Sequence, residues 1–204
     1  MAAGPGAAPP RAHSTGGHLR ATLVFLALML LLTGVAYPGV VTGIAEVIDP
    51  GAAGGSLLYH NGTLVGSSLI AQNLSRPYLF WERPSLSDYS FLNGTPALPG
   101  PSDPALRSLI NETVQYMQKY GNYTITAPLS LWLVSPSGSA LDPDLVPEAV
   151  LVQIPRVAAA TNLTVGFLTD FVNNHIANPE IPFVGVPYVN VLELDLALLP
   201  LIGR

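Results

Sequence analysis

An uninterrupted run of uncharged residues constrains this chain more than any other feature of its sequence. Residues 21–45 are 25 consecutive residues without a charge, and residues 23–32 are almost wholly apolar. A helix rises about 1.5 Å per residue, so this run exceeds the roughly 30 Å hydrocarbon core of a bilayer. We expect a transmembrane helix over residues 19–46 that remains as an uncleaved anchor. The alternative is a secretory signal peptide, with Gly34 and Ala36 as the small residues ahead of a cut.

Charge is distributed unevenly about this run. Arg11 and Arg20 precede it, whereas all 13 Asp and Glu residues follow it from Glu46 onward. The positive-inside rule then places the N-terminus in the cytoplasm and residues 47–204 in an extracytoplasmic domain. Residues 1–18, rich in Ala, Gly and Pro, are expected to form a disordered cytoplasmic tail. The predicted location is the plasma membrane, which the chain crosses once.

Small residues gather in the outer half of the predicted helix. Gly39 and Gly43 have the GxxxG spacing, and Gly34 precedes them. Glycines at this spacing let a second helix approach closely in a membrane, although small residues are also common in membrane helices without a partner. We interpret Gly34, Gly39 and Gly43 as a helix-packing face.

The rest of the chain mixes strand and helix patterns, which predicts the α+β class and one mixed domain after the anchor. Residues 51–55 are glycine-rich and predict a hinge, and residues 75–102 predict a long aromatic loop that docks on something. Strands are expected at residues 56–59, 62–65, 68–71 and 129–134. Helices are expected over residues 104–121, 147–154, 164–176 and 190–198. The last of these also alternates like a strand, but Asn190 and Glu193 suit a capping box and favour a helix.

Composition and motifs exclude several functions. The chain carries a net charge of −5 and only 10% charged residues, so it lacks the basic surface that nucleic acids require. It has no cysteine, and therefore neither disulfides nor thiolate metal sites. Asp142 and Asp144 are too few for a calcium loop. Residues 135–139 are rich in serine and glycine and predict a turn, because neither a GxSxG nor an SxxK motif accompanies them.

Six asparagines begin N-x-Ser/Thr triplets, and all six follow the predicted anchor. They are Asn61, Asn73, Asn93, Asn111, Asn122 and Asn162. Composition alone predicts about one such triplet, and the triplet is a glycosylation acceptor only on a translocated surface. Chance and a bias of turn composition are alternatives. We therefore treat these asparagines as glycosylation candidates that agree with the predicted topology.

Several segments together resemble the C subunit of the Kdp potassium-transporting ATPase over nearly the whole chain from residue 21. The anchor contributes Tyr37, Pro38 and Thr42 within residues 32–45. The outer domain contributes Arg83-Pro84-Ser85, the segment Ser137-Gly138-Ser139-Ala140-Leu141-Asp142-Pro143, the segment Gln153-Ile154-Pro155-Arg156-Val157-Ala158, and Val189-Asn190-Val191-Leu192-Glu193-Leu194. The chain departs from the family pattern at Glu46, where glutamine is typical.

The resemblance implies a noncatalytic accessory subunit of a high-affinity potassium pump. Its partners would be a channel-like potassium-translocating subunit and a P-type ATPase subunit, which themselves handle potassium and ATP. The family is also described as raising ATP affinity, with Gln153 as the corresponding nucleotide contact. A domain outside a bilayer about 40 Å thick cannot touch a nucleotide bound inside. We therefore interpret Gln153, Pro155 and Arg156 as a helix restart with a surface ion pair.

Two other functions remain open from the residues alone. An anchored envelope hydrolase would bring its few polar groups together only in the folded structure, and a receptor-like binding module would need no catalytic group at all. A subunit differs from both because it leaves the membrane together with two larger proteins.

Overall fold

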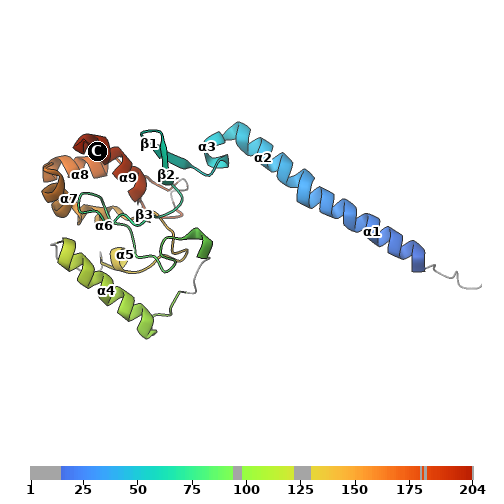
Figure 1. Cartoon of the computed structure of the whole chain (residues 1–204), viewed down its shortest axis with the longest axis horizontal. Coiled ribbons are helices and arrows are strands. Elements are labelled where there is room, and N and C mark those ends of the chain that lie inside the picture. The colour runs from blue at the N-terminus through green and yellow to red at the C-terminus, as the bar shows by residue number, and fades with distance from the viewer. Residues whose placement is uncertain (1–14, 94–97, 122–129, 180, 182, 204) are drawn as a thin grey trace, which may run out of the picture. The chain divides into compact units, whose positions relative to one another are not determined.

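The computed structural model describes residues 15–93, 98–121, 130–179, 181 and 183–203 (Figure 1). They belong to two compact units, Met1–Gly54 and Gly55–Arg204. The first unit is helical. Its helices α1 (Thr15–Leu31) and α2 (Tyr37–Ile48) are joined by a π-helical turn, η1 (Leu32–Ala36), and followed by the short helix α3 (Pro50–Ala53).

The long N-terminal apolar helix is therefore continuous and longer than the sequence predicted. It covers 33 residues from Gly16 to Ile48 and contains an 18-residue window that is apolar enough to cross a bilayer and is 0% buried. The turn at η1 follows from Pro38, which has no N–H to donate and crowds the carbonyl four residues before it. The Tyr37 N–H bonds instead to the Leu32 carbonyl, five residues back. The expected hinge is partly wrong, because residues 50–53 form a helical turn that Asp49 caps.

The second unit is mainly helical, with two small antiparallel sheets among its described residues. The α+β prediction is therefore confirmed only in part, because the strand content is small. Strands β1 (Leu57–His60) and β2 (Thr63–Ser67) form a hairpin, and β3 (Asp144–Leu145) pairs with β4 (Val189–Asn190). Asn61 and Gly62 take positive φ angles of 49° and 77° at the hairpin turn, as the Asn-Gly signal predicts. The helices are α4 (Pro104–Gly121), α5 (Ser130–Val134), α6 (Pro147–Leu151), α7 (Ile154–Thr161), α8 (Val165–Asn173) and α9 (Val191–Leu198), with 3₁₀ turns η2 (Phe91–Asn93) and η3 (Leu199–Ile202).

Local capping explains where several helices begin and end. The Thr164 hydroxyl accepts a hydrogen bond from the Phe167 N–H and starts α8, and the Asn190 side chain accepts one from the Glu193 N–H and starts α9. Pro155 separates α6 from α7, because a proline can occupy the first turn of a new helix but not the interior of an old one. Helices α6, α8 and α9 were expected, α7 follows the restart expected at Pro155, and the strand alternative for the C-terminal segment is wrong.

Two predicted strands are absent from the described residues. Residues 130–134 form α5, and its consecutive residues Leu133 and Val134 are both buried. In a half-buried strand these two side chains would point to opposite faces, and one of them would be exposed. Residues 68–71 turn away from the hairpin, with the Ile70 N–H bonded to the Ser67 carbonyl.

The core of the second unit lies among α6, α7, α8 and α9. Its fully buried side chains include Val150, Val157, Leu168, Val172 and Leu194. The long aromatic loop docks on this same core, because Phe80 and Trp81 are both buried there. Figure 1 shows α4 lying along the edge of the unit, away from α8 and α9.

Candidate functional site

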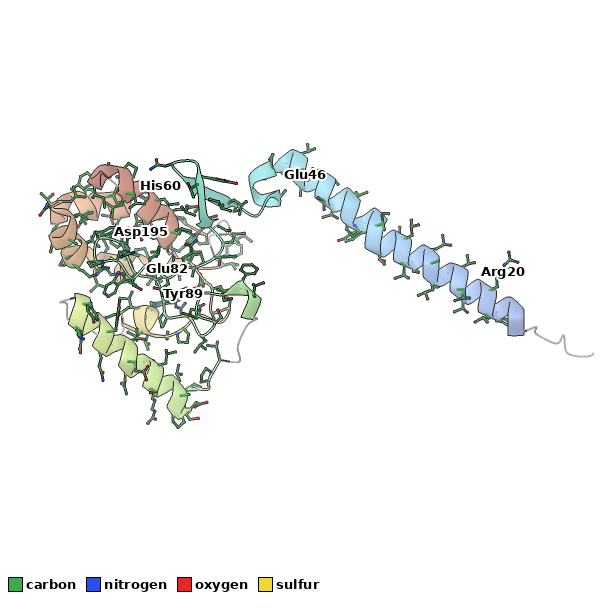
Figure 2. The ribbon with its side chains drawn as sticks, viewed as in Figure 1. Arg20, Glu46, His60, Glu82, Tyr89 and Asp195 are labelled. Atoms are coloured by element: carbon green, nitrogen blue, oxygen red, sulfur yellow. The ribbon has the colours of Figure 1, made fainter. Side chains whose placement is uncertain are left out.

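The small residues of the N-terminal apolar helix leave open space along it. A Cβ atom added at Gly34, Gly39 or Gly43 would meet no heavy atom within 4 Å in the described chain. Gly39 and Gly43 lie one turn apart on the same face, while Tyr37, Pro38 and Thr42 belong to the start of α2. Arg20 and Glu46 lie near opposite ends of the helix (Figure 2). No side chain of the described chain covers this face, so a second helix has room to pack there.

Gln153 is the polar centre of the second unit. It is 0% exposed, and its amide pairs with the backbone of Trp81: the Trp81 N–H donates to Oε1 at 2.7 Å, and Nε2 donates to the Trp81 carbonyl at 3.0 Å. Nε2 also donates to the Ala149 carbonyl, and Oε1 accepts from Arg156. A glutamine amide has two donor hydrogens and two acceptor lone pairs. All four positions are therefore occupied inside the protein.

Arg156 lies against the same loop and is only 6% exposed. One of its terminal nitrogens donates to the carbonyls of Pro77 at 2.6 Å and Leu79 at 2.8 Å, and its guanidinium lies 4.0 Å from the centre of the Trp81 ring. The expected surface position is wrong, because Arg156 is buried and its guanidinium caps backbone carbonyls. An irregular segment can enter a core only if its backbone groups find such partners.

Asp195 of α9 supplies the remaining contact to this segment. Its Oδ1 accepts a hydrogen bond from the Phe80 N–H at 2.9 Å. Burial raises the pKa of Asp195 well above its usual value, while the Phe80 N–H and the charge of Arg156 oppose that rise. Gln153, Arg156 and Asp195 together hold residues 79–81 in the core without a strand partner. We call these three side chains the loop anchor.

Two of the resembling segments meet at a second point. The Arg83 guanidinium donates to the carbonyls of Ser135 at 3.1 Å and Pro136 at 3.0 Å, and lies 3.6 Å from the carboxylate of Asp142. The Ser85 hydroxyl donates to the Ala140 carbonyl at 2.6 Å. Pro84 stands between these two residues and lines a cavity.

The serine-rich segment is a turn, as expected. The Ala140 N–H donates to the Ser137 carbonyl, and the Asp142 N–H lies 3.3 Å from the Ser137 hydroxyl. Gly138 lies within this turn. Ser137 is buried, and its hydroxyl accepts the hydrogen bond of the Asp142 N–H within the turn.

Asn190 connects the C-terminal motif to the same region. Its amide nitrogen donates to the Ser68 carbonyl at 2.7 Å and to the Asp144 carboxylate at 3.0 Å. The Val191 N–H donates to the Pro143 carbonyl. Burial and the nearby Asp142 charge raise the pKa of Asp144 to about 6, while the Asn190 hydrogen bond opposes the rise. The resembling segments thus contact one another and stabilise the fold.

The histidines of the second unit are not placed for nucleophilic catalysis. His175 lies 2.8 Å from the Phe171 carbonyl and His60 lies 3.2 Å from the Asn61 amide. Over the described ranges, no three His, Asp or Glu side chains gather as metal ligands would.

Four of the glycosylation candidates lie on the surface. Asn61, Asn73, Asn111 and Asn162 are exposed. Asn93 ends the turn η2, and Asn122 lies outside the described residues. Occupancy of these sites stays a prediction.

One surface feature was missed from the sequence. The apolar loop, which we define as Ile181, Phe183, Val184 and Val186, has every one of these side chains at least 50% exposed, with Phe183 at 88%. Exposed apolar side chains gathered in one segment are typical of an interaction surface. The sequence feature that could have indicated this surface is the absence of charged residues from 181 to 192.

Comparison with known proteins agrees with the family resemblance seen in the sequence. The family model described as "KdpC: K+-transporting ATPase, c chain" matches residues 19–199. The chain is 42% identical to the "Potassium-transporting ATPase KdpC subunit" of Ralstonia nicotianae, over 92% of this chain and 93% of that protein. It is 39% identical to the protein of the same description in Gemmatimonas aurantiaca, over 89% and 92% of the two chains, and 38% identical to that of Serratia proteamaculans, over 89% and 97%.

Proposed function

Because this chain belongs to the KdpC family and is a subunit of the Kdp potassium-transporting ATPase complex, we propose that it acts as a noncatalytic accessory subunit. In this role it stabilises the assembly of the channel-like potassium-translocating subunit with the P-type ATPase subunit. One observation carries the proposal. The polar residues of the motifs, Gln153, Arg156 and Asn190, are committed to internal hydrogen bonds, whereas the apolar loop faces outward.

The arrangement in the membrane follows from charge. The N-terminus lies in the cytoplasm with Arg11 and Arg20, and residues 47–204 lie outside with the acidic residues. The Gly39 and Gly43 face packs on a helix of a partner subunit, and the apolar loop packs on a partner's extracytoplasmic surface. Apolar contact suits this loop, because no charged residue occurs between residues 181 and 192.

ATP and potassium are handled by the partner subunits in this proposal. Gln153 has no hydrogen-bonding capacity left for a nucleotide, since all four amide positions are used within the protein. Any effect on ATP affinity is therefore a coupling free energy transmitted through the complex.

Co-purification tests this proposal. The tagged full chain should leave detergent with both larger Kdp subunits. Replacing Phe183 and Val184 of the apolar loop by aspartate should reduce their recovery severalfold, because charge would be buried at the contact. The matched control is Leu92→Asp, which alters an equally exposed leucine outside this loop. Undiminished recovery with the loop variant, or recovery of the chain alone, contradicts the proposal.

A further inference from the structure

A cavity of about 370 Å³ lies between α4 and the segment that follows β2. Glu82 and Trp81 line it from the loop held by the loop anchor, and Glu112, Thr113 and Tyr116 line it from α4. Figure 2 shows Glu82 and Tyr89 on the side of the unit that α4 covers. The volume falls within the range of roughly 300–1,000 Å³ that small-ligand pockets occupy.

Glu82 has an incomplete set of partners at this cavity. It is 5% exposed; its Oε2 accepts a hydrogen bond from the Gln72 N–H at 2.7 Å, but its buried Oε1 has no hydrogen-bond partner in the described chain. Burial, assisted by the charges of Asp195, Asp142 and Asp144, raises the pKa of Glu82 to about 9. A buried polar atom without a partner is costly, so a cation that paired with the Glu82 carboxyl would stabilise it.

The composition of the cavity restricts the charge of that ligand. None of its described lining residues is a lysine, arginine or histidine, whereas Glu82 and Glu112 both line it. Anions are therefore excluded, because no positive group would replace their lost hydration. Arg156 stacks on Trp81 at 4.0 Å, but it is committed to the loop carbonyls and does not line the cavity.

Aromatic rings complete the site. The rings of Trp81 and Tyr116 lie 5.2 Å apart, and Tyr116 is 41% exposed at the cavity. The Tyr89 hydroxyl donates to the Arg83 carbonyl, which holds the Tyr89 ring beside the cavity. Aromatic faces combined with carboxylates are the groups that recognise ammonium ions.

We propose that this cavity binds an organic ammonium group, with Glu82 as the carboxylate partner and the Tyr116 ring as the aromatic wall. The group belongs either to a free amine or to a lysine side chain of a partner protein. On binding, the Glu82 carboxyl loses its proton to solvent and its carboxylate pairs with the ammonium. Tyr89 and Glu112 are the other titratable groups lining the cavity, while Asp142, Asp144 and Asp195 act on Glu82 from neighbouring elements.

Calorimetry on the full chain in detergent micelles tests this site with butylammonium chloride. The expected result is saturable binding with release of about one proton per amine, seen as a difference in heat between phosphate and Tris buffers at neutral pH. Glu82→Gln should abolish the proton release and weaken binding by at least about tenfold. Glu148→Gln is the control, because Glu148 is an exposed acid that does not line the cavity. An unchanged response in Glu82→Gln, or no saturable binding, overturns the proposal.

A second variant keeps the test independent of Glu82. Thr113 lines the cavity from α4 and donates its hydroxyl only to the Leu109 carbonyl of its own helix, at 2.8 Å. Thr113→Lys should place a tethered ammonium in the cavity and exclude butylammonium. Retained butylammonium binding in this variant, or its displacement by equal concentrations of potassium chloride, overturns the assignment. If butylammonium binding disappears on assembly with the Kdp partners, the occupant is a partner's lysine. If butylammonium binding persists in the complex, the occupant is a free amine. Both results support the ammonium chemistry.

Discussion

At the scale of single residues, the Gln153 side chain hydrogen-bonds the backbone of Trp81 in place of a neighbouring strand. Its amide offers one donor and one acceptor to the Trp81 backbone, as a paired strand does. The loop can therefore carry Phe80 and Trp81 into the core without forming a sheet. Arg156 and Asp195 complete the arrangement by satisfying the carbonyls before Phe80 and the Phe80 N–H.

Gln153→Ala should lower the free energy of unfolding by about 3 kcal/mol, because it leaves several buried partners unsatisfied. Chemical denaturation of the full chain in micelles measures this loss. Gln118→Ala makes the same substitution on the exposed face of α4 and should change stability by less than about 0.5 kcal/mol. A Gln153 variant as stable as the wild type that lost measurable ATP binding would instead assign the residue to a nucleotide.

Glu82 predicts a stability that depends on pH. Its pKa rises from 4.5 when unfolded to about 9 in the folded protein, so the unfolded state binds fewer protons between these values. The contribution of Glu82 to the free energy of unfolding is therefore fully present below pH 4.5. It falls as pH rises towards about 9, by up to about 1.4 kcal/mol per pH unit. Glu82→Gln cannot ionise and should remove this slope, as denaturation curves measured from acid to alkaline pH would show.

The matched variant for this pH series is Glu148→Gln, since Glu148 is exposed. It should retain the slope of the wild type. A slope that persists in Glu82→Gln would assign the pH dependence to Asp195 or Asp144, whose pKa values are also raised by burial.

At the scale of elements, the membrane helix combines a widened turn with an open face. Pro38 causes the π-helical turn, and Gly39 and Gly43 follow it directly. The Thr33 hydroxyl donates to the Met29 carbonyl at 2.7 Å, so this polar side chain is satisfied within its own helix. Thr33 therefore needs no hydrogen-bond partner from another helix.

Replacing both Gly39 and Gly43 by isoleucine should reduce recovery of the Kdp complex severalfold, because the added side chains prevent close helix approach. The substitutions meet open space in the chain itself, so the outer domain should keep its stability. Quantitative immunoblots of the co-purified subunits measure the effect.

Val41→Ile with Ala45→Ile places the same side chains on the opposite face of the helix and should leave recovery unchanged. Equal loss from both pairs would indicate general damage to the anchor. Full recovery from the glycine pair would assign assembly to the outer domain.

At the scale of the whole molecule, the distribution of charge is the basis of the proposed topology. Arg11 and Arg20 lie before the membrane helix, and Glu46 and Asp49 lie at its other end. Protease added to right-side-out vesicles should therefore degrade residues 55–204 and spare an epitope tag at the N-terminus. Inverted vesicles should give the opposite pattern. A protected domain in right-side-out vesicles would reverse the predicted orientation.

Local signals account for the features predicted from the sequence. The uncharged run, the caps at Thr164 and Asn190, the break at Pro155 and the Asn61-Gly62 turn each act within a few neighbouring residues. The strand predicted near residues 130–134 was wrong because a short apolar run has no periodicity that separates a strand from a helix. The resemblance to the Kdp subunit likewise rested on short segments and is confirmed by the family match.

The sequence by itself determined the long apolar helix, the main helix starts and the family, because apolar length, capping groups and motif order are properties of consecutive residues. Only the tertiary structure decided what the motif residues do. Gln153 meets Trp81 across 72 residues, and Phe80 meets Asp195 across 115. Burial, free hydrogen-bonding capacity and pKa depend on such distant neighbours. For that reason the surface position expected for Arg156 became a buried one, and Ile181, Phe183, Val184 and Val186 of the uncharged segment proved to be exposed.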